Sequence, residues 1–287
     1  MNTTFKLWTQ LGLGTVLAGG LLAACGGEAG ENAAQGEAGA SGTAATAGEG
    51  EGGESAGGEG EGGAAAGGEG EGGVAVADAA TDPIAYGTAL AVAEAHVVAA
   101  RDAYAAGNTD AAADMFAHPV SEVLLDMEPT FTKLGVADMS PLFTAASDAA
   151  LARKPAAEVN KAYDAIIAAL RAAASKAPRS DATAATIAAG VIADQIERAS
   201  AMYRLLPTND AYEPYLDGYG FAKVAASSFA ASGAAIKAQN PAAHTRITEA
   251  LGVLARAYPA AVRPADLPVA PGAVSGASAK VMLATAN

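Results

Sequence analysis

The chain has 287 residues, a formal net charge of −14, one cysteine and an aromatic content of 5%. One cysteine excludes an internal disulfide, and a strongly acidic chain with few aromatic residues argues against a nucleic-acid-binding protein. The hydrophobic fraction is 51%, but alanine is the commonest residue, and its methyl group buries little area. Because alanine is also the strongest helix former, we expect an all-α protein with closely packed helices and no nucleic-acid partner.

Residues 1–24 have the outline of a signal peptide, with the basic Lys6 followed by an apolar stretch that ends before Cys25. The segment Leu22-Ala23-Ala24-Cys25 resembles the lipobox of bacterial lipoproteins. This resemblance implies that the Cys25 thiolate accepts a diacylglyceryl group, and that cleavage before it leaves a lipid-anchored N-terminus. The alternatives are an ordinary transmembrane helix or a chance cysteine.

A lipid anchor at Cys25 implies a membrane partner and an extracytoplasmic location in the cell envelope. Gly26 and Gly27 follow the cysteine where an aspartate would favour retention at the inner membrane. By resemblance to Gram-negative lipoproteins, the outer membrane is therefore favoured. In a Gram-positive cell, the same motif implies the outer face of the single membrane.

Residues 25–80 comprise Cys25 and a segment rich in Gly, Ala and Glu, which we predict to be a disordered tether. Residues 57–63 recur as residues 67–73, and neither copy has an apolar face that could pack. Specific metal binding by its Glu-Gly-Glu units is not expected, because a glycine-rich chain would lose too much entropy in holding several oxygens at fixed positions.

Residues 81–258 are punctuated by caps and prolines at helical spacing, and no segment alternates with a period of two. We predict one bundle of about six to seven antiparallel helices. The expected helices cover 83–106, 109–135 with an interruption at Pro119, 140–155, 156–177, 181–206, a segment that follows the aromatic stretch 212–221 and reaches 239, and 241–258. The Pro-rich residues 259–287 are predicted to form an extended C-terminal tail.

Two of the three histidines lie on the first predicted helical hairpin. If the turn centres on Gly107 and Asn108, His96 and His118 lie at the same height, and Glu122 is one turn beyond His118. Two imidazoles and a carboxylate suit a divalent transition metal, so these three residues are the candidate metal ligands. The alternative is a structural or surface role, since a histidine beside Pro119 can bond a carbonyl freed by a kink.

A second candidate site is the aromatic stretch from residue 212 to residue 221. It contains Tyr212, Tyr215, Tyr219 and Phe221. These side chains are either the rim of a pocket or a surface for a partner, or they fill gaps that alanine-rich helices leave in the core.

The surroundings of His96, the segment Ala117–Glu122 and the segment Ala211–Phe221 resemble extracytoplasmic helical proteins of the imelysin and iron-permease periplasmic-domain kind. The resemblance covers about 50 residues, and it implies a helical bundle with a role in metal uptake. The imelysin pattern is His-x-x-Glu, whereas His118 and Glu122 have one more residue between them.

Motifs for nucleophilic catalysis and phosphate binding are absent from the sequence, so we expect no enzymatic activity. The sequence predicts a lipid-anchored helical protein that binds a ligand, with a transition-metal ion as the candidate, as a non-catalytic accessory of metal uptake or homeostasis. The alternative is a structural or interaction lipoprotein of the envelope that meets a protein partner and has no small-molecule site.

Overall fold

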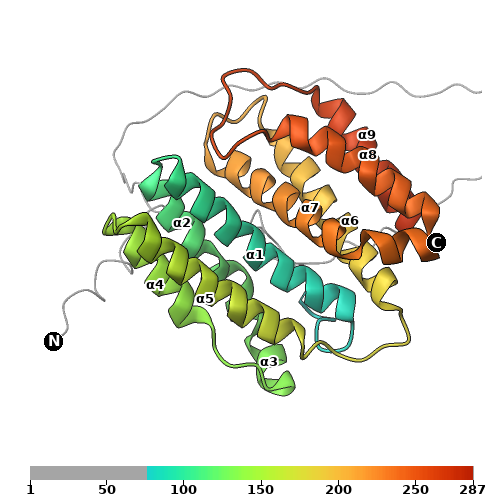
Figure 1. Cartoon of the computed structure of the whole chain (residues 1–287), viewed down its shortest axis with the longest axis horizontal. Coiled ribbons are helices and arrows are strands. Elements are labelled where there is room, and N and C mark those ends of the chain that lie inside the picture. The colour runs from blue at the N-terminus through green and yellow to red at the C-terminus, as the bar shows by residue number, and fades with distance from the viewer. Residues whose placement is uncertain (1–75, 287) are drawn as a thin grey trace, which may run out of the picture. The chain divides into compact units, whose positions relative to one another are not determined.

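The computed structural model describes residues 76–286, which form nine α-helices, one π-helical turn and no strand (Figure 1). The all-α prediction is confirmed. The elements are α1 (Pro83–Ala105), α2 (Thr109–Pro119), η2 (Val120–Leu124), α3 (Leu125–Leu134), α4 (Ser140–Leu151), α5 (Ala156–Ala174), α6 (Ala184–Leu205), α7 (Glu213–Gln239), α8 (Pro241–Ala257) and α9 (Pro271–Thr285).

The predicted signal peptide, Cys25 and most of the predicted tether lie outside the described residues. The boundary at residue 80 is wrong, because residues 76–80 belong to the folded part. Ala79 is completely buried, and the Asp78 carbonyl accepts hydrogen bonds from the backbone N–H groups of Thr81 and Asp82. This turn leads directly into α1.

Eight of the nine helices form two groups of four, and α1 is the member of the first group that lies beside the second (Figure 1). In the first group α1, α2, α4 and α5 contact each other in a ring, and in the second α6, α7, α8 and α9 do the same. Helix α1 also contacts α6 and α7, and so it joins the two groups. Residues 88–100, the middle of α1, are accordingly all buried.

Helix α1 is enclosed by its neighbours over most of its length. Asp82 caps its start, with Oδ1 accepting from the Ile84 N–H at 2.7 Å, and Pro83 occupies the first turn. Gly107, with φ of 89°, ends the hairpin turn that follows. Within residues 76–286, α1 is the only helix that is both long enough and apolar enough to span a membrane. Most of it is buried, as in the core helix of a folded domain.

The predicted interruption at Pro119 is confirmed. The second predicted helix is divided into α2, the π-helical turn η2 and α3, and it ends at Gly135 with φ of 67°. Proline lacks the N–H that an α-helix needs at this position, so the hydrogen-bonding pattern changes over the next turn. His118 therefore lies at the end of α2, while Glu122 lies in η2.

The extended C-terminal tail is a wrong prediction for residues 271–285. Pro271 does not prolong an extended segment; it occupies the first turn of α9, where its missing N–H costs nothing. The spacing of Val274, Ser278 and Val281 places them on one buried face, and α9 contacts α6 and α8.

The start of α7 was also predicted wrongly. The aromatic stretch 212–221 was expected to precede a helix, but α7 begins at Glu213 and contains Gly218 and Gly220. Glycine is common in turns, yet here it stands inside a helix because neighbouring groups approach closely at both positions. The residues of this stretch therefore follow helical spacing.

Candidate metal centre

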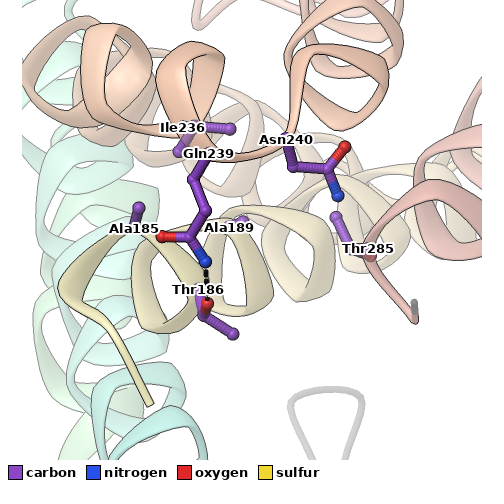
Figure 2. A pocket seen from close by; sticks show the side chains of 7 residues that line it. All are labelled: Ala185, Thr186, Ala189, Ile236, Gln239, Asn240 and Thr285. Carbon is purple, nitrogen blue, oxygen red and sulfur yellow. Dashed lines mark hydrogen bonds between the residues drawn. The ribbon is translucent and has the colours of Figure 1, made fainter.

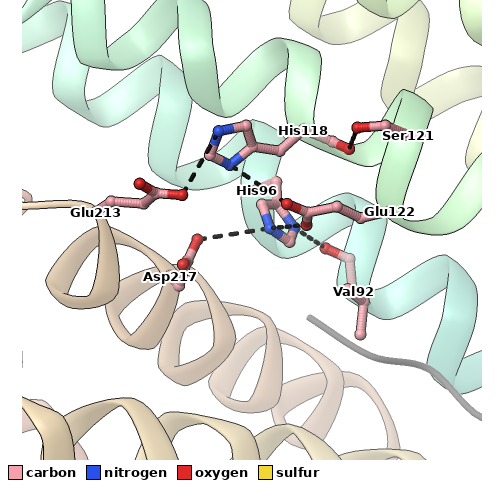
Figure 3. A network of polar contacts seen from close by, with 7 residues as sticks. All are labelled: Val92, His96, His118, Ser121, Glu122, Glu213 and Asp217. Carbon is pink, nitrogen blue, oxygen red and sulfur yellow. Dashed lines mark hydrogen bonds and ion pairs between the residues drawn. The ribbon is translucent and has the colours of Figure 1, made fainter. Parts of the chain in front are cut away.

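His96 is the innermost residue of the candidate site, and it is 2% exposed. Its Nδ1 lies 2.8 Å from the Val92 carbonyl oxygen, so Nδ1–H donates one turn back along α1. In the neutral ring this leaves the lone pair of Nε2 directed into the site. Nε2 lies 3.4 Å from Glu122 Oε2 and 3.5 Å from Asp217 Oδ1 (Figure 3).

The structure brings His118 and Glu122 to His96, as the predicted hairpin register requires. The two imidazole centroids are 6.0 Å apart. His118 Nδ1 lies 3.9 Å from Glu122 Oε1, while its Nε2 lies 3.6 Å from Glu213 Oε1 (Figure 3). Nδ1 of His118 thus faces the less exposed carboxylate, Glu122, and Nε2 faces the more exposed one, Glu213.

Asp217 and Glu213 belong to this cluster, and sequence reasoning missed both. They lie four residues apart on α7, and so they share a helix face. Three residues, His96, His118 and Asp217, each offer one candidate ligand atom, and these atoms lie within 4.8 Å of one another. The spacing of the two acids was a usable signal, but Gly218 and Gly220 favoured interpretation of the segment as a turn.

Asp217 has an unusual environment for a carboxylate. It is 5% exposed, and its Oδ1 is buried without a hydrogen-bond partner. Burial raises the pKa of Asp217 to about 6, although the nearby imidazoles of His96 and His118 oppose the rise. A buried acceptor without a donor is costly, so this oxygen is well suited to accept a cation.

Burial and neighbouring charges shift the pKa values of the other two inner groups, His96 and Glu122, in opposite directions. Burial lowers the pKa of His96, but the contact with Glu122 and the charge of Asp217 outweigh it, and the pKa lies above the ordinary 6.5. Burial raises the pKa of Glu122, but His96 outweighs it, and that pKa lies below the ordinary 4.5. The contact between His96 and Glu122 therefore stabilises the charged form of each group against the effect of burial.

A pocket of about 250 Å³ opens beside the outer part of the cluster. Asp114, His118 and Glu213 contribute its polar side chains, and Tyr212 and Leu216 are among the others that line it. Glu213 is half-exposed, whereas Asp217 is buried. The pocket thus connects solvent to the His118 side of the cluster, where Glu213 provides a negative charge.

The aromatic residues divide between the two predicted roles. Tyr215, Tyr219 and Phe221 are buried, so a partner surface is wrong for these three, and they fill the core. The Phe221 ring packs edge-on against His96 with centroids 5.9 Å apart. Tyr212 does line the pocket beside His118, as a rim residue would.

A second pocket, of about 380 Å³, lies where residues of α6, α7 and α9 meet (Figure 2). Its polar side chains bond within the protein: Gln239 Nε2 donates to Thr186 Oγ1 at 2.7 Å, and Asn240 Nδ2 donates to the Ala284 carbonyl at 3.0 Å. Its lining contains no charged residue. The histidine cluster is therefore the stronger candidate for a functional site.

No protein-family model matches this chain, and neither the curated proteins nor the solved structures include a match. The resemblances to lipoproteins and to imelysin-like proteins therefore stay predictions from the sequence.

Proposed function

We propose that the folded part binds a divalent transition-metal ion through His96, His118, Glu122 and Asp217. The observation that carries the proposal is the buried Asp217 Oδ1, which has no hydrogen-bond donor and faces the Nε2 of His96. A metal ion would satisfy this oxygen and bind the Nε2 lone pair of His96. Two imidazoles and two carboxylates suit ions such as Fe²⁺, Mn²⁺, Co²⁺ and Zn²⁺.

The role that fits this site is non-catalytic binding, as an accessory of metal uptake or homeostasis. Three carboxylates and two imidazoles give the cluster an excess of negative charge when the histidines are neutral. Glu213 at the pocket mouth is placed to attract a cation before it reaches the buried ligands.

Isothermal titration calorimetry on the full chain with Zn²⁺ and Mn²⁺ tests the proposal. We expect one ion per chain, and an affinity reduced about 10-fold or more by Asp217→Asn. Asp126→Asn is the matched control, because Asp126 is an exposed acid four residues after Glu122. Equal, weak heats for the wild type and Asp217→Asn would overturn the proposal and leave the envelope interaction protein as the better hypothesis.

We also propose that lipidation of Cys25 holds this bundle at the cell envelope. The support is the lipobox-like segment Leu22–Cys25 after an apolar stretch. Cys25→Ser should move the protein from the detergent phase to the aqueous phase in detergent partitioning. The mass of the wild-type N-terminal peptide should include the lipid. Unchanged partitioning of the variant would contradict lipidation.

A further inference from the structure

The backbones of α1 and α7 approach each other closely where Gly220 meets Ala95. A Cβ atom at residue 220 would lie 2.3 Å from the Ala95 carbonyl oxygen and 3.3 Å from Ala99 Cβ. The first contact is with backbone, so no side-chain rotation can relieve it. Any residue larger than glycine must push the two helices apart.

Helix α7 has little room to move in the opposite direction. A Cβ atom at Gly218 would lie 2.0 Å from Tyr258 Oη, and that hydroxyl is buried and donates to the Ala199 carbonyl at 2.8 Å. Residues two apart on a helix point about 200° away from each other. Gly218 and Gly220 therefore allow α7 to fit between Tyr258 on one side and α1 on the other.

This close contact lies within one turn of the candidate ligands. Ala95 immediately precedes His96, and Gly220 is three residues after Asp217. Aspartate has a short side chain, and its Oδ1 comes within 3.5 Å of His96 Nε2 because the two backbones are close. Alanine is the usual small residue of this protein and a better helix former than glycine, so the glycine at residue 220 is explained by the close approach of the Ala95 backbone.

We propose that Gly220 is a positioning residue for metal binding: it sets the distance between α1 and α7 at which Asp217 and His96 bind the same ion. This inference rests on the proposed metal site. It predicts that separating the helices weakens metal binding, and that a longer acidic side chain at residue 217 compensates for the separation.

The test uses the full chain titrated with Co²⁺, whose visible absorption reports the number and kind of ligands. Gly220→Ala should weaken binding about 10-fold or more and alter the spectrum. Asp217→Glu alone should also weaken binding, because the longer side chain does not fit the native spacing. The double variant Gly220→Ala, Asp217→Glu should bind more tightly than either single variant, which a merely structural role for Gly220 would not produce.

Gly87→Ala is the matched control. Its new Cβ would lie 2.9 Å from Val191 Cγ2, the end of a side chain, at a contact between α1 and α6. This variant perturbs the packing of α1 nine residues before His96, and its Co²⁺ affinity should equal that of the wild type. If Gly220→Ala loses its helical circular dichroism, Ala99→Val adds bulk beside Gly220 from the α1 side, and its loss of affinity should again be rescued by Asp217→Glu.

The outcomes separate the two proposals. Wild-type binding that Gly220→Ala leaves unchanged would overturn the positioning role and preserve the metal site. A double variant that binds no better than the single variants would also overturn that role. Absence of Co²⁺ binding by the wild type would overturn the metal site itself and this inference with it.

Discussion

His96 on α1 and Asp217 on α7 face each other across the contact between the two groups of helices, with Nε2 and Oδ1 3.5 Å apart. Both residues are buried, and the aspartate oxygen has no hydrogen-bond donor. A pair of this kind places charge inside the structure, where an unsatisfied carboxylate is costly. A bound cation would remove this cost, and so metal binding should raise the free energy of unfolding.

Metal affinity should fall as the pH falls from 7.5 to 5.5. The pKa of Asp217 is raised to about 6 and that of His96 is raised above its ordinary value, so protons compete with the ion over this range. We expect the Kd to rise about 10-fold or more, as measured by calorimetry at several pH values. The Kd of Asp217→Asn should depend less steeply on pH. A wild-type Kd that does not change with pH would contradict these ligand assignments.

Glu213→Gln should slow the association of the metal ion without changing its dissociation. Glu213 is half-exposed at the pocket mouth, where a carboxylate raises the local concentration of cations. We expect an association rate about threefold lower at low ionic strength, with the difference lost in high salt, in stopped-flow measurements. The exposed Glu158 on α5 supplies the control Glu158→Gln. Faster dissociation with unchanged association would instead make Glu213 a direct ligand.

Arg171→Ala should destabilise the first group of helices. Both terminal nitrogens of Arg171 donate to the carboxylate of Glu94, which is only 8% exposed. Loss of these donors leaves a buried charge without partners, but Arg171 is largely exposed, and so solvent moderates the effect. We expect a loss of about 1 to 3 kcal/mol in the free energy of unfolding, measured in urea.

Arg246→Ala is the control for that measurement. Arg246 pairs with Glu249, and both side chains are about half exposed. Its removal should change the free energy of unfolding by less than about 0.5 kcal/mol. Equal effects of the two substitutions would mean that Glu94 does not depend on Arg171.

Val281→Asp should show that α9 is an integral part of the bundle. Val281 is completely buried, whereas its neighbour Met282 is 43% exposed. A carboxylate at residue 281 would be buried without a partner, so we expect a loss of about 3 kcal/mol or more, seen as a lower melting temperature. Met282→Asp should melt like the wild type. Equal melting of the two variants would indicate that residues 271–285 do not pack on α6 and α8.

Several features of this fold depend only on interactions between residues close in sequence. Such features could be predicted from the sequence. Asp82 and Pro83 start α1, and Gly107 ends its turn, because caps and φ preferences act over a few residues. The approach of His96 to His118 follows from one short turn between consecutive helices. The helical interruption at Pro119 has the same local origin.

The sequence by itself thus determined the all-α class, most helix boundaries and the half of the candidate site that lies on one hairpin. Tertiary structure decided the other half, because Asp217 reaches His96 through packing between helices that are far apart in the chain. Gly218 and Gly220 show why local patterns were insufficient. Glycine serves both turns and close helix contacts, and only the positions of Ala95 and Tyr258 in space distinguish the two.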